Sequence, residues 1–74
     1  IDTPANVKCL FYMPTQRKVD LTNLLEAADD LLVLAGVLAD DNSKIIVSHD
    51  GSRVLLDRDK PRTEIYITEV QNEL

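Results

Sequence analysis

Between residues 21 and 35, apolar side chains recur at every third or fourth position, and this spacing predicts an amphipathic α-helix with one face in a core. Asp20 stands just before the first of them, where its carboxylate can accept hydrogen bonds from the free N–H groups of the first turn. Gly36 follows the last, at a position that favours a residue without a Cβ. The apolar positions are Leu21, Leu24, Leu25, Ala28, Leu31, Leu32 and Ala35.

Four other stretches alternate in polarity or are rich in β-branched and aromatic side chains, which is typical of strands. Asp50 and Gly51 separate the second stretch from the third, and this dipeptide predicts a two-residue hairpin turn. A polar loop precedes the last strand, and residues 71–74 are expected to fray. The four stretches are residues 5–12, 44–49, 52–56 and 62–70.

The order of elements is therefore β-α-β-β-β, which predicts an α+β fold with one amphipathic helix packed on a small, mostly antiparallel sheet. Residues 1–74 are read as a single domain, since a chain of this length supports only one thin core. The strands carry more apolar residues than one helix can cover. We therefore expect a second copy, or further chain, to cover the other face of the sheet.

The chain begins at Ile1 without an initiator methionine and contains no signal peptide or transmembrane run, so we interpret it as a piece of a longer cytoplasmic protein. A lone cysteine, Cys9, lies among apolar residues and is expected to be a buried, reduced thiol.

The formal net charge is −5, from 13 acidic and 8 basic residues. An acidic chain repels phosphate backbones unless its cations are segregated. Here they are partly segregated, because the helical stretch has none and four lie in the last third, namely Arg53, Arg58, Lys60 and Arg62.

The expected polar face of the helix is acidic. Thr22, Glu26 and Asp30 are spaced four residues apart and form one stripe, without a lysine or arginine to neutralise it. Such a stripe is relieved by solvent, by a basic partner or by a cation. The remaining members of the polar face are Asn23 and Asp29.

Several site classes are excluded by spacing. Residues 40–51 begin like a calcium loop, but Ile45 and Gly51 stand where an EF-hand needs its glycine and its bidentate glutamate. There is no glycine-rich phosphate loop and no Cys/His cluster, so neither a nucleotide cofactor nor structural zinc is expected. His49 is interpreted as structural or solvated, and a Cys9–His49 nucleophile has little support because nothing near Cys9 would lower its pKa.

Among the classes of site considered, a cation site formed by carboxylates remains. Asp20, Asp40 and Asp41 offer the oxygen ligands that Mg²⁺ prefers. A four-turn helix spans about 20 Å, however, so the two ends meet only if the chain turns back or a second subunit contributes. On the residues alone, Asp20 is more simply a helix cap, and Asp40 and Asp41 are a solvated turn.

The segment KVDLTNLLEAADDLLVLAGVLADDN resembles the D-x-D-N-L-x-K-A-x-x-D-A-L motif, with its following glycine and Asp-Asp pair, of RusA-type Holliday junction resolvases. A strand ending in Met13-Pro14 before it, and a closing strand ending in Ile-Thr-Glu after it, extend the resemblance over nearly all 74 residues. The N-terminal part of that family is absent from this sequence.

The resemblance implies a catalytic role for Asp20 and for Asp41, the second residue of the acidic pair. It implies supporting roles for Asn23 and Asp30, which match the motif asparagine and the mid-helix aspartate. Two positions depart from the motif: Thr22 replaces its second aspartate, and Glu26 replaces its lysine. Because these two lie one turn apart, we expect the lost carboxylate to be relocated to Glu26. The expected metal ligands are Asp20, Glu26, Asp40 and Asp41.

The activity that the resemblance implies is Mg²⁺-dependent cleavage of four-way DNA junctions by symmetric nicking, in recombination and repair, with Mn²⁺ as the substitute metal. It implies a homodimer encoded by a bacterium or prophage, with Arg17, Lys18 and Arg53 as DNA contacts. Two alternatives stay open. One is a decayed relative that binds DNA or protein without cleaving, and the other is an interaction domain whose acidic helix docks a basic partner.

Overall fold

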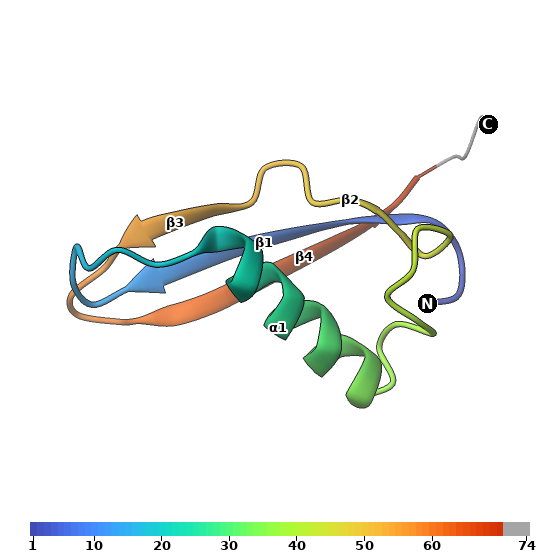
Figure 1. Ribbon diagram of the computed structural model, residues 1–74, viewed down its shortest axis with the longest axis horizontal. Helices are drawn as coiled ribbons and strands as arrows, with labels where there is room; N and C mark the ends of the chain where they lie inside the picture. The colour runs from blue at the N-terminus through green and yellow to red at the C-terminus, as the bar shows by residue number, and fades with distance from the viewer. Residues whose placement is uncertain (71–74) are drawn as a thin grey trace.

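The computed structural model describes residues 1–70. Its elements follow the expected order: β1 (Ala5–Met13), α1 (Leu21–Leu34), β2 (Ile46–Ser48), β3 (Arg53–Leu56) and β4 (Arg62–Glu69). In this part of the chain one helix lies across one face of a four-stranded sheet, so the α+β class is confirmed (Figure 1). The tail expected to fray, residues 71–74, lies outside the described residues. Nowhere in residues 1–70 is there a helix with the length and apolarity needed to cross a membrane.

The sheet is mixed, and the expectation of a mostly antiparallel sheet is wrong. Strand β1 is central and pairs antiparallel with β4 along nearly its whole length, from Ala5–Glu69 to Tyr12–Arg62. Its other edge is shared by β2 and β3, which both run parallel to β1. Parallel neighbours need a crossover connection, and α1 supplies it between β1 and β2.

The expected hairpin at Asp50 and Gly51 is also absent, because β2 and β3 follow each other along one edge. A turn does form there: Ser52 N–H donates to the His49 carbonyl at 3.0 Å, and Gly51 has φ +88°. It bulges out of the edge strand, and the Asn6 side chain holds it. Asn6 Oδ1 accepts from the Ser48 hydroxyl and from Asp50 N–H, while Asn6 Nδ2 donates to the Asp50 carbonyl at 3.1 Å.

The helix ends agree with the sequence pattern. Asp20 is the N-cap, and Gly36 follows the C-cap Ala35 with φ +76°, a left-handed conformation that glycine adopts without strain. The buried face of the helix agrees only in part with the face expected from the sequence. Ala28 is buried and most of the expected leucines pack on the core, but Leu31 is 65% exposed and Ala35 is exposed too, while Val33 packs inward.

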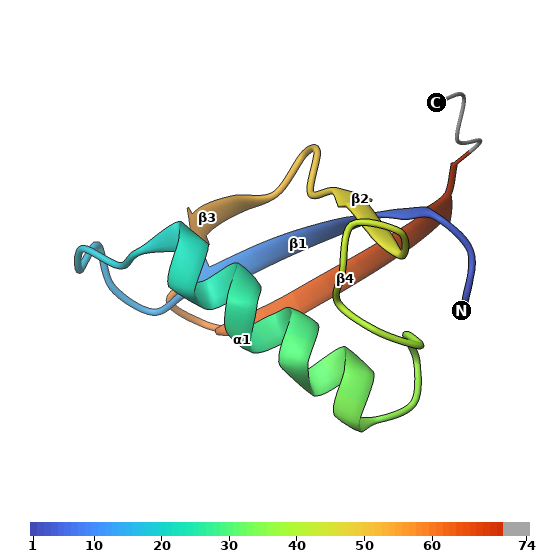
Figure 2. The same cartoon turned by 45° about the vertical axis from the view of Figure 1, so that its right-hand side comes forward.

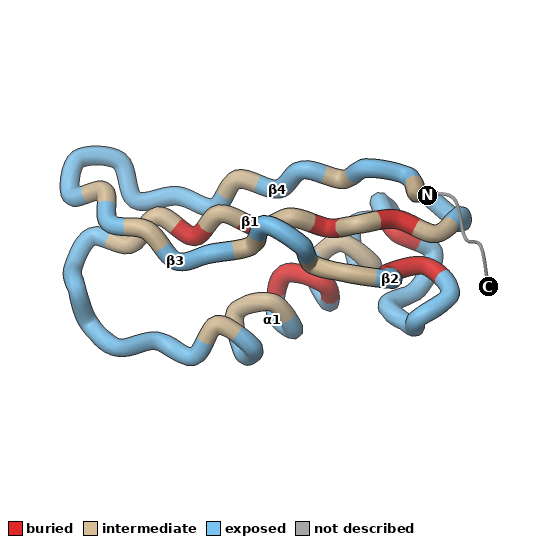
Figure 3. Tube along the Cα trace, turned by 90° about the horizontal axis from the view of Figure 1, so that it is seen from above, coloured by how far each residue is buried: buried red, intermediate tan, exposed pale blue. Residues whose placement is uncertain are grey.

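The core is a thin layer between α1 and the sheet (Figures 2 and 3). Alternate β1 side chains point into it, and the segment that follows α1 closes it from one end. Cys9 is fully buried, as expected, and burial raises the pKa of its thiol, with the Asp29 carboxylate adding to the effect. A reactive thiolate is therefore disfavoured at this position. The core residues are Val7, Cys9, Phe11, Ala28, Leu38, Ile45 and Ile46.

Candidate functional site

Asp20 lies at the N-terminal end of α1 and is exposed. Its Oδ1 accepts hydrogen bonds from the N–H groups of Thr22 at 2.9 Å and Asn23 at 3.4 Å. These bonds fix the carboxylate over the first turn of the helix and use only one of its two oxygens. Asp20 is thus a cap, and it directly follows the exposed basic loop of residues 15–19, which includes Arg17 and Lys18.

Asp40 and Asp41 lie in a tight turn after the helix. Asp40 Oδ1 accepts from Asp41 N–H at 2.7 Å, and its Oδ2 accepts from Asn42 Nδ2 at 3.0 Å. Asn42 Oδ1 in turn accepts from Lys44 N–H at 2.9 Å. Short polar side chains commonly stabilise turns in this way. The turn is therefore shaped by Asp40 and Asn42, which leaves Asp41 exposed at its tip.

The pKa of the Asp41 carboxyl is raised by its acidic neighbours. Hydrogen bonding with the Asp40 carboxylate is the largest cause of a raised pKa at Asp41, and the negative charges of Asp40 and Asp30 add to it. Asp30 lies on the exposed acidic face in the second half of α1, so its charge reaches the turn from the helix. A cation bound between these groups would relieve the repulsion.

The two ends of the expected site are separated within one copy of the chain. The helix has 14 residues, which corresponds to about 21 Å, and Asp20 and the acidic turn lie at its opposite ends (Figures 1 and 2). Glu26 is exposed between them. Residues 1–70 contain no group of three or more acidic, histidine or cysteine side chains arranged to hold a metal ion.

The expected DNA contacts also lie apart. Arg17 and Lys18 are exposed in the loop that leads to Asp20, whereas Arg53 begins β3. Arg53 is paired with Leu10 in the parallel ladder, so its side chain lies on the sheet face opposite α1. The basic loop and Arg53 therefore lie on different surfaces of the protein.

Asp29 departs from the sequence interpretation. It was expected on the polar face, but it is only 8% exposed, and its Oδ2 lies 2.9 Å from His49 Nε2. The pair joins the middle of α1 to the bulge between β2 and β3. Asp29 lies one turn after Leu25 and one turn before Val33, both of which pack on the core, so the helix buries it with them.

No protein-family model, curated protein or solved structure matches this chain. The resemblance to RusA-type resolvases rests on the motif residues themselves.

Proposed function

We propose that this protein is a Mg²⁺-dependent endonuclease of the RusA type that cleaves four-way DNA junctions. One observation supports it most directly. The motif carboxylates Asp20 and Asp41 are both exposed; the Asp20 carboxylate accepts hydrogen bonds from the helix N-terminus, the Asp40 carboxylate fixes the backbone of Asp41, and the pKa of Asp41 is raised beside Asp40 and Asp30. Carboxylates whose negative charges lie close together in this way offer the hard oxygen ligands that a divalent metal prefers.

The side chains fit the metal chemically. Asp20 and Asp41 would supply hard carboxylate oxygens, with Asp40 and Glu26 as further donors. Bound Mg²⁺ supplies positive charge against a scissile phosphate and a polarised attacking water. Asp40 keeps the turn closed, so that Asp41 is presented outward, while Arg17 and Lys18 beside Asp20 would hold the phosphate backbone in place.

The distance along α1 points to a site shared by two copies. Two chains related by a twofold axis, with their α1 helices antiparallel, would bring Asp20 of one copy near the partner's Asp41. The same axis would generate two equivalent sites, which is the arrangement that symmetric nicking needs.

An apolar groove beside α1 supports this dimer. It has a volume of about 410 Å³ and lies between α1 and the β1–β4 side of the sheet. Leu31 lines it at 65% exposure, and Leu34, one turn away along the helix, is 83% exposed. The occupant that we propose is α1 of the second copy, whose own exposed leucines match the groove in chemistry. The groove is lined by Phe11, Met13, Leu24, Ala27, Leu31 and Ile65, with Ala28 and Thr63.

The experiment is cleavage of a synthetic four-way junction, with and without Mg²⁺, resolved on a denaturing gel. Wild type is expected to make paired symmetric nicks only with the metal. Asp41→Asn should slow cleavage by more than about a hundredfold, because charge stabilisation worth several kcal/mol is lost. Asp59→Asn, an exposed carboxylate in the loop before β4, is the matched control and should cleave normally.

A non-catalytic relative is the second candidate, favoured by Thr22 and Glu26, which are exposed at the motif positions where they depart from the family. Tight junction binding by wild type without nicking would identify it. If wild type neither binds nor nicks the junction, both candidates are contradicted.

A further inference from the structure

The sheet face opposite α1 is uncovered in residues 1–70. Val7, Cys9 and Phe11 of β1 point into the core, so the side chains that alternate with them point to this outer face. The ladder register places Lys8 opposite Tyr66 and Tyr12 opposite Arg62. The Lys8 ammonium lies 4.9 Å from the centre of the Tyr66 ring.

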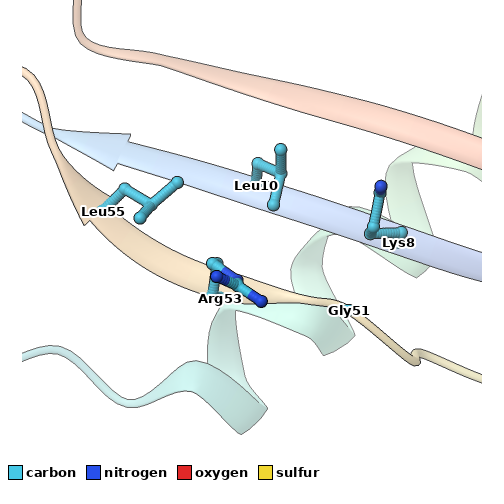
Figure 4. A pocket seen from close by; sticks show the side chains of 5 residues that line it. All are labelled: Lys8, Leu10, Gly51, Arg53 and Leu55. Atoms are coloured by element: carbon cyan, nitrogen blue, oxygen red, sulfur yellow. The ribbon is translucent and has the colours of Figure 1, made fainter.

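A shallow depression of about 260 Å³ lies on this face (Figure 4). Two cations, Lys8 and Arg53, line it together with the apolar side chains of Leu10 and Leu55. Gly51 completes the rim. A Cβ at Gly51 would lie 2.7 Å from Lys8 Cδ, and φ there is +88°, so only glycine lets the bulge approach the lysine so closely.

The charges of Lys8 and Arg53 are free to meet an anion. Within residues 1–70 neither makes an ion pair, whereas Arg62 on the same face is bound by Asp57 and Glu64. Glu64 also accepts the Tyr66 hydroxyl at 2.9 Å, so the one carboxylate among these outer-face ladder pairs is occupied by its own neighbours. Six of the 13 acidic residues lie at α1 or in the turn that follows it, on the other layer: Asp20, Glu26, Asp29, Asp30, Asp40 and Asp41.

The anion that best matches this surface carries flat aromatic groups, which can stack on a ring, as well as negative charge. Tyr66 is 47% exposed and stands next to Lys8, so an aromatic ring and two cations face solvent together. A positive surface with an adjacent aromatic ring is the arrangement that holds unpaired nucleic-acid strands, with phosphates on the cations and bases stacked on the ring.

We propose that the outer face of the sheet binds single-stranded DNA, with a backbone phosphate in the depression between Lys8 and Arg53 and a base against Tyr66. This surface lies on the opposite side of the sheet from α1. The inference goes beyond the proposed endonuclease, because it requires neither Asp20, nor Asp41, nor a metal.

The test is fluorescence anisotropy of a labelled oligothymidylate of about 15 nucleotides, a length suited to a single small domain. EDTA is present throughout, so that loss of nuclease activity and loss of strand binding are separate results. Wild type is expected to bind, with an affinity that falls as salt rises. Lys8→Gln combined with Arg53→Gln should weaken binding and lower the slope of log K against log salt by roughly 0.7, since the two cations share one phosphate and each single-strand phosphate contact contributes about 0.7.

Tyr66→Leu is expected to weaken binding by roughly fivefold or more while the salt slope is kept, because stacking rather than charge is removed. Arg58→Gln, an exposed cation in the loop between β3 and β4, is the matched control and should bind as wild type. Circular dichroism melting establishes that each variant is folded, and the Gly51 amide resonance should shift when the oligonucleotide is added.

Three binding results would overturn the proposal: no binding by wild type at low salt, an equal loss in Arg58→Gln and in the Lys8/Arg53 double variant, or tighter binding of a duplex of the same length. An unshifted Gly51 resonance at saturation would also overturn it.

Discussion

Among residues 1–70, Asp29 is the buried charged side chain, and only one of its two carboxylate oxygens has a hydrogen-bond partner. Oδ2 meets His49 Nε2, but Oδ1 is buried without a hydrogen-bond partner. A buried carboxylate without partners carries a desolvation penalty, so His49 offsets part of the cost of placing Asp29 in this layer. The pair also fastens α1 to the bulge of the edge strand.

Replacing His49 with alanine should therefore lower the free energy of unfolding by about 1–3 kcal/mol, measured by urea denaturation, because Asp29 loses its partner. Adding Asp29→Leu to the same variant should restore part of that loss, since the unpaired carboxylate is gone. If His49→Ala unfolds at the same urea concentration as wild type, the contact contributes nothing.

Asp20 has two roles that substitution can separate. Asparagine caps helices about as well as aspartate, so Asp20→Asn should melt close to wild type, whereas Asp20→Ala should lose about 0.5–2 kcal/mol. Both variants lose the charge and should fail to cleave junction DNA. Normal cleavage by Asp20→Asn would mean that Asp20 is a cap and nothing more.

At the scale of elements, Arg62 ties the start of β4 to the loop before it. Its guanidinium donates to Asp57 and Glu64, both at 2.8 Å, and stacks 3.8 Å from the centre of the Tyr12 ring. Arg62 lowers the pKa of both carboxyls below their ordinary values of 3.8 and 4.5. The stabilisation is therefore present above those values and is lost as pH falls through the lowered values of the folded state.

Arg62→Gln should accordingly lower the melting temperature at neutral pH by more than it does in acid, once the pH has fallen through the lowered pKa values of Asp57 and Glu64. The remaining low-pH difference reports the Tyr12 contact. Arg58→Gln should show no such pH dependence. A gap between wild type and Arg62→Gln that stays constant or widens on acidification would contradict the ion-pair account, which predicts a small effect for exposed groups.

Elements were predictable where the signal is local. Asp20, Gly36 and the alternation of residues 62–70 each depend on near neighbours, and the helix and strand bounds agree within two residues. Strand pairing depends on distant partners. Asp50 and Gly51 do form a turn, but Asn6, over 40 residues away, binds it as a bulge and leaves no hairpin.

The candidate site, like the fold, was predictable only where it depends on residues close together in the sequence. The sequence locates the carboxylates at the two ends of one helix, but whether Asp20 and Asp41 can meet depends on the path of the chain and on a second copy. Asp29 was misplaced for a related reason: an acidic residue reads as exposed unless its partner is known, and His49 comes from the other side of the fold.

At the scale of the whole molecule, the core between α1 and the sheet is thin and part of its apolar edge is exposed to solvent. The radius of gyration is 13.0 Å, against roughly 11 Å for a compact domain of this length. Leu31 and Leu34 face solvent beside an apolar groove. In the dimer that we propose, a second copy on this side would bury them and would bring the separated carboxylates together, so that one contact would serve both stability and catalysis.

The most direct measurement mixes two inactive variants, Asp20→Asn and Asp41→Asn, after refolding them together, and assays nicking of a four-way junction with Mg²⁺. If each site takes Asp20 from one copy and Asp41 from the other, a mixed dimer keeps one intact site, and nicking should return to roughly a quarter of the wild-type rate. The products should be singly nicked junctions. A mixture as inactive as either variant alone, with wild type active, would contradict the shared site, and an inactive wild type would contradict the endonuclease itself.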